Sequence, residues 1–140
     1  SGIIMANMTR TVLDYGSIVL KSGNIQFFTL TATSEKTLKR GSILARDSVT
    51  GFLVEYVKGG STNGNGVPLT VLAEETTVTA AEVAAGLCKV SCFTEATLRQ
   101  DGLVIIADGD ASNVDHVELD GLRSMNIDTS KVTDQSVLDN

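Results

Sequence analysis

A mainly β fold with short helices is the class that the sequence predicts, and three observations support it. Val and Thr, which are stiff at χ1 and suit a pleated surface, are prominent along the chain. Short apolar runs alternate with glycine-rich and polar turn segments. Aromatic residues make up only 4% of the 140 residues and Trp is absent, so the core must be built from Val, Ile, Leu and Ala. A chain of this length fits one small compact domain.

We divide the chain into an amino-terminal arm, residues 1–14, and a single β domain, residues 15–140. The arm is too apolar for an inert tail, and we expect it to extend from the domain and to order against a partner. The alternative is a tag remnant, marked by Ser1-Gly2, followed by a first strand. The apolar arm residues that we expect to bind the partner are Ile3, Ile4, Met5, Met8, Val12 and Leu13.

The domain is expected to begin with a β-hairpin. Residues 17–20 and 25–30 are apolar enough for strands, and residues 21–24 between them have the composition of a turn. Residues 31–39 are polar and predict a loop. The cations at the end of this loop are interpreted as a solvated turn and not as a binding patch. They are Lys36, Lys39 and Arg40.

Compact β elements follow in the middle of the chain. Short strands are expected near 42–46 and 52–57, and a buried strand at 69–73. The glycine-rich run 59–66 would fit a phosphate-binding loop only if a Lys and then a Ser or Thr closed it and opened a helix. Val-Pro stands there instead, so we expect a surface loop.

The next segment combines a short helix with a strand. After a loop or irregular strand at 74–78, Thr79 and Glu82 match a capping box and predict a helix that ends before Gly86. A strand is expected at 87–93. Its more uniformly apolar face holds Cys88, Val90 and Cys92.

The last third of the chain is predicted to mix helix and strand. Residues 94–100 predict a helical turn, and the wholly apolar run 103–107 predicts a buried strand. Residues 115–125 have helical spacing. The residues expected on the apolar face of that helix are Val117, Leu119, Leu122 and Met125.

The two cysteines, Cys88 and Cys92, stand four residues apart. In a strand their Cα atoms would be separated by about 13 Å, whereas a disulfide needs them within about 7 Å. We therefore expect two buried reduced thiols and assembly in a reducing cytosol. A metal site is the alternative, but His116 is the only histidine and the spacing does not match the usual zinc patterns.

The acidic run 108–115 is the strongest candidate for a chemical site. Its alternating oxygen side chains resemble the start of a calcium loop, which also needs Gly at the sixth position and Glu at the twelfth. Asn113 and Leu119 stand at those positions. We interpret the run as a solvated turn that caps the next helix at Asp115.

No catalytic constellation is recognisable, and we predict that the chain is not an enzyme and uses no metal or cofactor. The histidine His116 is expected on the surface of a helix, and no Ser or Cys stands in a nucleophile motif. Glu74-Glu75 is an ordinary surface pair of carboxylates.

Charge and hydropathy exclude further classes of partner. The net charge is -6 at pH 7 and the cations are scattered, so nucleic acid is not expected as a partner. The sequence has no apolar run of about 18 residues, so no membrane-spanning helix is expected. The amino end lacks the basic region and long apolar stretch of a secretion signal.

Taken in order, these elements resemble the phage lambda-type head decoration proteins, also called capsid-stabilising proteins. The resemblance covers roughly residues 38–127. The stretches that carry it are Gly41-Ser42-Ile43-Leu44, residues 51–56, the glycine-rich loop with Pro68 to Leu72, Ala85-Gly86-Leu87-Cys88-Lys89-Val90, and Leu122-Arg123-Ser124-Met125-Asn126-Ile127 within 119–127.

The resemblance implies a small mixed β domain with an extended amino-terminal arm. It implies a structural virion protein that is made in the host cytoplasm and binds the outside of an expanded bacteriophage capsid as a homotrimer, stabilising the head. The implied partner is the major capsid protein, and the arm orders on the shell by adding a strand to a capsid-protein sheet. The alternative is a tail or fibre component, or another adhesive β module that binds protein or carbohydrate.

Overall fold

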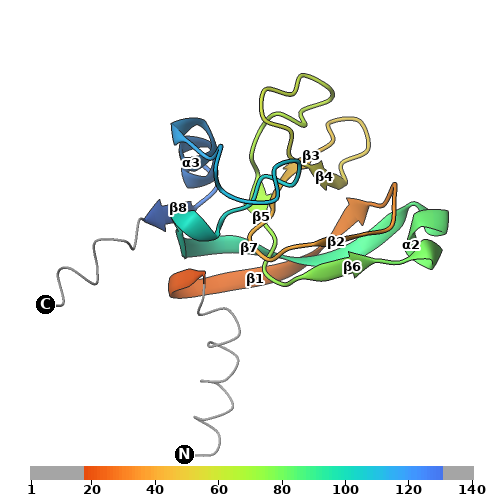
Figure 1. Cartoon of the computed structure of the whole chain (residues 1–140), viewed down its shortest axis with the longest axis horizontal. Coiled ribbons are helices and arrows are strands. Elements are labelled where there is room, and N and C mark those ends of the chain that lie inside the picture. Colours follow the sequence, from red (N-terminus) through yellow and green to blue (C-terminus); the bar gives the residue numbers. More distant parts are fainter. Residues whose placement is uncertain (1–17, 131–140) are drawn as a thin grey trace, which may run out of the picture.

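The computed structural model describes residues 18–130, apart from the side chains of residues 20–22. It is mainly β with short helices, which confirms the predicted fold class (Figure 1). The strands are β1 (Val19–Thr31), β2 (Lys36–Leu38), β3 (Ile43–Arg46), β4 (Leu53–Glu55), β5 (Thr70–Val71), β6 (Thr76–Val78), β7 (Leu87–Arg99) and β8 (Ile127–Ser130). The helices are α2 (Ala80–Ala85), the short 3-10 helix η1 (Gln100–Gly102) and α3 (His116–Arg123).

Six strands form one mixed sheet in the order β5-β3-β4-β1-β7-β8. The antiparallel pair β1–β7, two strands of 13 residues each, spans the width of the molecule (Figure 1). The sheet curls back on itself, because Leu72 forms a bridge with Cys92 of β7. The next residue, Ala73, donates its backbone N–H to the Ser91 carbonyl at 2.8 Å. The central strands therefore enclose a small barrel-like core.

Both faces of the central strands are buried, as the alternation along β3 shows. Ile43 and Ala45 belong to one apolar cluster and Leu44 belongs to the other. The first cluster is completed by α3, β8 and the segment 103–105. The second is completed by α2 and by the two-stranded sheet β2–β6. The sequence prediction of strands near 42–46, 52–57 and 69–73 is confirmed by β3, β4 and β5.

The capping box predicted at Thr79 is confirmed. The Thr79 hydroxyl accepts from the Glu82 backbone N–H at 3.2 Å, and the Glu82 carboxylate accepts from the Thr79 backbone N–H at 3.0 Å. Gly86 ends α2 in the left-handed conformation, with φ of 78°. The helix is therefore fixed at both ends by its sequence.

The predicted hairpin over residues 17–30 is wrong, because β1 is one continuous strand. Its pairing with β7 shifts register between Val19 and Ile25, so the turn-like residues make a local irregularity and the chain does not reverse. Gly23 allows the two strands to approach: a Cβ there would lie 3.0 Å from the Ala96 Cβ. The turn composition thus marks a bulge.

The helical turn predicted at 94–100 is also wrong, because β7 continues to Arg99. Ala96 and Leu98 are buried, whereas Glu95 is exposed, which is the two-residue period of a strand. This stretch pairs with β1 on one side and with β8 on the other. The backbone hydrogen bonds of two neighbours outweigh a weak local helical preference.

Three smaller expectations are corrected in detail. Residues 103–107 are buried at their start, as predicted, but Val104 and Ile105 make only isolated bridges and not a strand. The loop predicted at 31–39 contains β2. Of the expected apolar face of α3, Leu122 is buried, whereas Val117 is 48% exposed. The side chain that takes its place inside is Glu118.

The predicted cationic turn is not one unit. Lys36 lies in β2 and forms an ion pair with Glu55, whereas Lys39 donates to the Gly109 carbonyl at 2.8 Å. Arg40 lies on the wall of a groove, described below. The three cations therefore serve separate local contacts.

Candidate functional site

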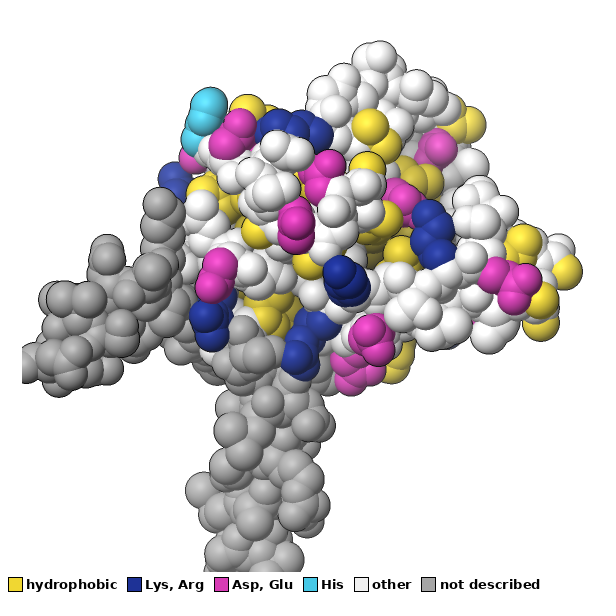
Figure 2. Space-filling model, viewed as in Figure 1, with side chains coloured by type: hydrophobic (Ala, Val, Ile, Leu, Met, Phe, Trp, Pro, Cys, Tyr) yellow, Lys and Arg dark blue, Asp and Glu magenta, His cyan; other side chains and the backbone are white. Residues whose placement is uncertain are grey.

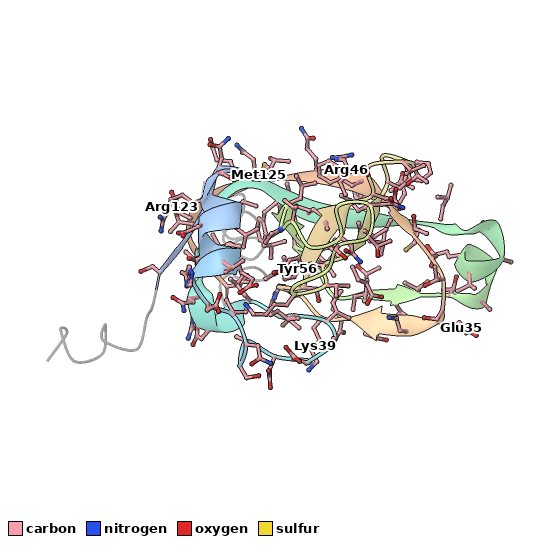
Figure 3. All side chains as sticks on the ribbon, turned by 90° about the horizontal axis from the view of Figure 1, so that it is seen from above. Glu35, Lys39, Arg46, Tyr56, Arg123 and Met125 are labelled. Atoms are coloured by element: carbon pink, nitrogen blue, oxygen red, sulfur yellow. The ribbon has the colours of Figure 1, made fainter. Side chains whose placement is uncertain are left out.

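A buried polar cluster joins β4 to α3, and its centre is Glu118. This carboxylate is the third residue of α3 and its side chain is fully buried. It accepts hydrogen bonds from the Tyr56 hydroxyl, from Lys58 Nζ at 2.9 Å to both oxygens, and from the Asp115 backbone N–H at 2.8 Å. Lys58 also pairs with the Asp115 carboxylate at 3.1 Å. Tyr56 lies in the middle of the molecule (Figure 3).

The electrostatics of this cluster fit a structural role, in which it holds α3 to the loop after β4. Burial, and then the hydrogen bond to Glu118, raise the pKa of Tyr56 well above its usual range. The hydrogen bond to Glu118 also raises the pKa of Lys58. The Val117 backbone N–H, followed by Lys58, lowers the pKa of Asp115. At neutral pH Tyr56 and Lys58 both keep their protons and act as hydrogen-bond donors, so neither can accept a proton from a substrate.

Sequence reasoning missed this cluster although one signal for it was present. Asp115 and Glu118 stand three residues apart, which is the spacing of a capping box, and the structure has both hydrogen bonds of that box. The prediction that Asp115 caps the helix is confirmed. Burial of Glu118 could not be foreseen, because its partners Tyr56 and Lys58 lie 62 and 60 residues away in the chain.

The acidic run 108–115 is occupied by its own turn contacts. Asp110 accepts from the Ser112 backbone N–H at 3.0 Å, and Asp108 accepts from the Asn113 amide at 3.0 Å. Within residues 18–130, no three His, Cys, Asp or Glu side chains are grouped so that they could hold a metal ion. The chemistry of the run is that of a hydrogen-bonded surface turn.

The cysteines and the histidine lie where the sequence placed them. Cys88 and Cys92 are buried free thiols. Burial raises the pKa of Cys88 to about 11 and that of Cys92 to about 12. Reactive cysteines have a depressed pKa, so these thiols suit packing. His116 is exposed at the first position of α3.

A mainly apolar opening in the surface, here called the apolar mouth, is lined by Phe28, Arg46, Leu69, Thr70, Phe93, Thr94 and Met125. Its cavity has a volume of about 180 Å³. Met125 is 38% exposed, and Arg46 donates to the Gly51 carbonyl at 2.6 Å. Figure 3 shows Arg46 and Met125 on the same edge of the molecule.

Other large apolar side chains are exposed beyond this mouth. Phe27 of β1 is the most exposed aromatic residue described, at 73%. The remaining members of this exposed set are Val49, Phe52, Val57, Val67, Leu87 and Val117. Acidic and basic side chains are interspersed on the face that Figure 2 shows. That face therefore presents no field of one charge sign to a partner.

A second, larger groove lies where the described chain begins. It has a volume of about 440 Å³ and is lined by Ile18, Arg40, Glu75 and Gly102. The two charged residues in its lining, Arg40 and Glu75, come from separate segments of the chain. Among the described residues that line the groove, none is a nucleophile and no cluster of titratable groups indicates catalysis.

The six arm residues predicted to bind a partner lie outside the described residues. They are Ile3, Ile4, Met5, Met8, Val12 and Leu13. None of the helices in residues 18–130 combines the length and apolar character needed to cross a membrane. No protein-family model matches the chain, and no curated protein matches its sequence.

Proposed function

We propose that this chain is a non-enzymatic structural virion protein that binds the outside of an expanded phage capsid as a trimer and stabilises it. Its partners are the major capsid protein and two further copies of itself. The proposal rests on the order of elements that resembles the lambda-type decoration proteins, and on the surface described above.

The observation that supports this proposal most directly is the exposed apolar surface of a small domain. Phe27 is 73% exposed, and Phe28, the next residue of β1, lines the apolar mouth together with Met125. Large apolar side chains left exposed on a small domain are candidates for contact with another protein. Within residues 18–130 this surface is uncovered, and a trimer seated on a shell would cover it.

The polar cluster supports the same proposal, because its polar groups are used in contacts within the fold. Glu118 uses its carboxylate on Tyr56, Lys58 and the backbone of Asp115. These contacts fix the loop after β4 to α3, so the groups that look most like catalytic residues stabilise the fold.

A trimer needs only modest contacts per copy, because three linked binding sites act at a high effective concentration.

Co-sedimentation with purified capsid shells tests the proposal. We expect the chain to pellet with expanded shells and to remain in the supernatant with unexpanded ones. Light scattering on the shell-bound material after release should give three times the 14.7 kDa mass of one chain, or the mass of one chain if trimers form only on the shell. Binding to host cells or glycans in the absence of shells would instead favour the adhesive alternative.

A further inference from the structure

The edge of β1 that faces β4 is open over most of its length. β1 pairs with β7 from Val19 to Thr31, but it meets β4 only where Leu30 lies beside Leu53. Among the described strands, none pairs with residues 19–29 on that edge. An unpaired strand edge is a row of free backbone donors and acceptors, and proteins usually cover it.

This open edge is apolar at the end nearest β4. Phe27 is 73% exposed, and the side chain of Phe28 lines the apolar mouth. Arg46, on the wall of the mouth, pairs with Leu53, the first residue of β4. The mouth therefore lies where β4 begins and residues 19–29 of β1 have no described neighbour on that edge. A cavity of about 150 Å³ can hold benzene, so the 180 Å³ here has room for one large apolar side chain.

The chain that could cover the edge starts directly from it. Ile18, the first described residue, precedes β1, and 17 residues stand before it. Tyr15-Gly16-Ser17 has the composition of a three-residue hairpin loop. A reversal there would set Leu13 opposite Val19 and Ile4 opposite Phe28. Residues 4–13 and residues 19–28 would then each span about 30 Å, at about 3.3 Å per residue.

The composition of the arm fits this placement. In the same register Met5 would stand opposite Phe27. Residues 1–14 contain one Arg and one Asp, so their side-chain charges cancel. A neutral apolar segment suits an apolar edge. A segment tethered to that edge also has an effective concentration in the millimolar range, which favours its own chain over a second copy.

We infer that, in the shell-free protein, residues 3–13 run back along the open edge of β1 as an added strand, with Ile3, Ile4 and Met5 covering Phe27 and the apolar mouth. The arm then has two alternative binding sites, the edge of β1 and the capsid. To engage a shell it must leave β1, so docking on the domain competes with docking on the capsid and uncovers Phe27 at the moment of attachment. Docking of the arm on β1 concerns the free protein alone, whereas its release to a shell rests on the proposed function.

An engineered disulfide tests the register without any shell. Met5→Cys with Phe27→Cys places two cysteines opposite each other, within the distance that a disulfide needs. We expect an intramolecular bond in the oxidised monomer. Met5→Cys with Thr77→Cys, an exposed position of β6, is the matched control and should form none. The native thiols are buried. A cross-linked dimer would overturn docking within one chain in favour of a second copy.

Hydrogen exchange provides the second measurement. Amides of residues 23–28 that face the open edge should exchange about tenfold or more faster when residues 1–14 are deleted, because their hydrogen-bond partners are lost. Amides that join β7 to β8 report whether the truncated fold is intact and should not change. Equal exchange of the edge amides in both chains, with no disulfide in the designed pair, would overturn the inference.

Discussion

At the scale of single residues, Glu118 is the position on which most contacts converge. A fully buried carboxylate is costly unless each oxygen is hydrogen-bonded, and here a tyrosine, a lysine and a backbone N–H supply those bonds. Every buried side-chain nitrogen or oxygen within residues 18–130 has a hydrogen-bond partner. The cluster therefore stabilises one arrangement of α3 on the sheet.

Replacing Tyr56 by Phe tests this role. The change keeps the ring but removes the hydroxyl donor, so Glu118 remains buried with one bond fewer. We expect the free energy of unfolding to fall by about 1–3 kcal/mol, measured by urea denaturation. Asp120→Asn is the control, since its ion pair with Arg123 is 63% exposed on both sides, and it should change stability by less than about 0.5 kcal/mol. Equal effects would contradict a special role for the cluster.

Asp115 predicts part of the acid sensitivity. Its pKa is lowered in the folded protein, by the Val117 backbone N–H first and then by Lys58. A lowered folded pKa means that the unfolded chain binds the proton more tightly, so stability is present above the unfolded value of about 4 and is lost as pH falls through the folded value. Asp115→Asn, which retains a capping side chain, should flatten the decline of stability between about pH 5 and pH 2. An unchanged slope would show that Asp115 contributes none of it.

At the scale of elements, local signals predicted helix ends and short strands well. The capping box at Thr79 and the cap at Asp115 each involve residues only three positions apart. Strands β3, β4 and β5 are short apolar runs between turns. Such elements are determined mainly by their own sequence, which is why pattern reasoning finds them.

Long-range pairing decided the elements that the sequence did not reveal. The residues around Gly23 have turn composition, yet β7 holds them in a strand. Residues after Thr94 lie between β1 and β8 and extend for the same reason. The interior position of Glu118 likewise depends on partners about 60 residues away. The fold class could be predicted from the sequence, but the strand lengths and the polar cluster could not.

The contact between Gly41 and residues 102–104 gives a prediction at this scale. Gly41 has a φ of +94°, and a Cβ there would lie 2.0 Å from the Gly102 carbonyl oxygen. We expect Gly41→Ala to destabilise the fold by about 3 kcal/mol, from steric overlap added to backbone strain. Gly51→Ala is the matched control, because φ is +78° but no atom lies within 4 Å. It should cost about 1–2 kcal/mol. Equal losses measured by thermal or urea unfolding would contradict the clash at Gly41.

At the scale of the whole molecule, we propose that a folded domain carries a separate attachment arm. Residues 18–130 contain both apolar clusters and the closing bridge between Leu72 and Cys92. A chain lacking residues 1–14 should therefore keep its circular dichroism spectrum and cooperative unfolding, and lose binding to expanded shells. Undiminished co-sedimentation of this truncated chain would contradict the attachment role of the arm.

Trimeric attachment to an expanded capsid is the central claim, and imaging tests it most directly. Expanded shells lacking any decoration protein would be saturated with the chain and imaged by electron cryo-microscopy. We expect three-lobed density on the outside of the shell at the three-fold and quasi-three-fold positions, with each lobe fitting one copy of residues 18–130. Bare shells, or single copies bound at other positions, would contradict it.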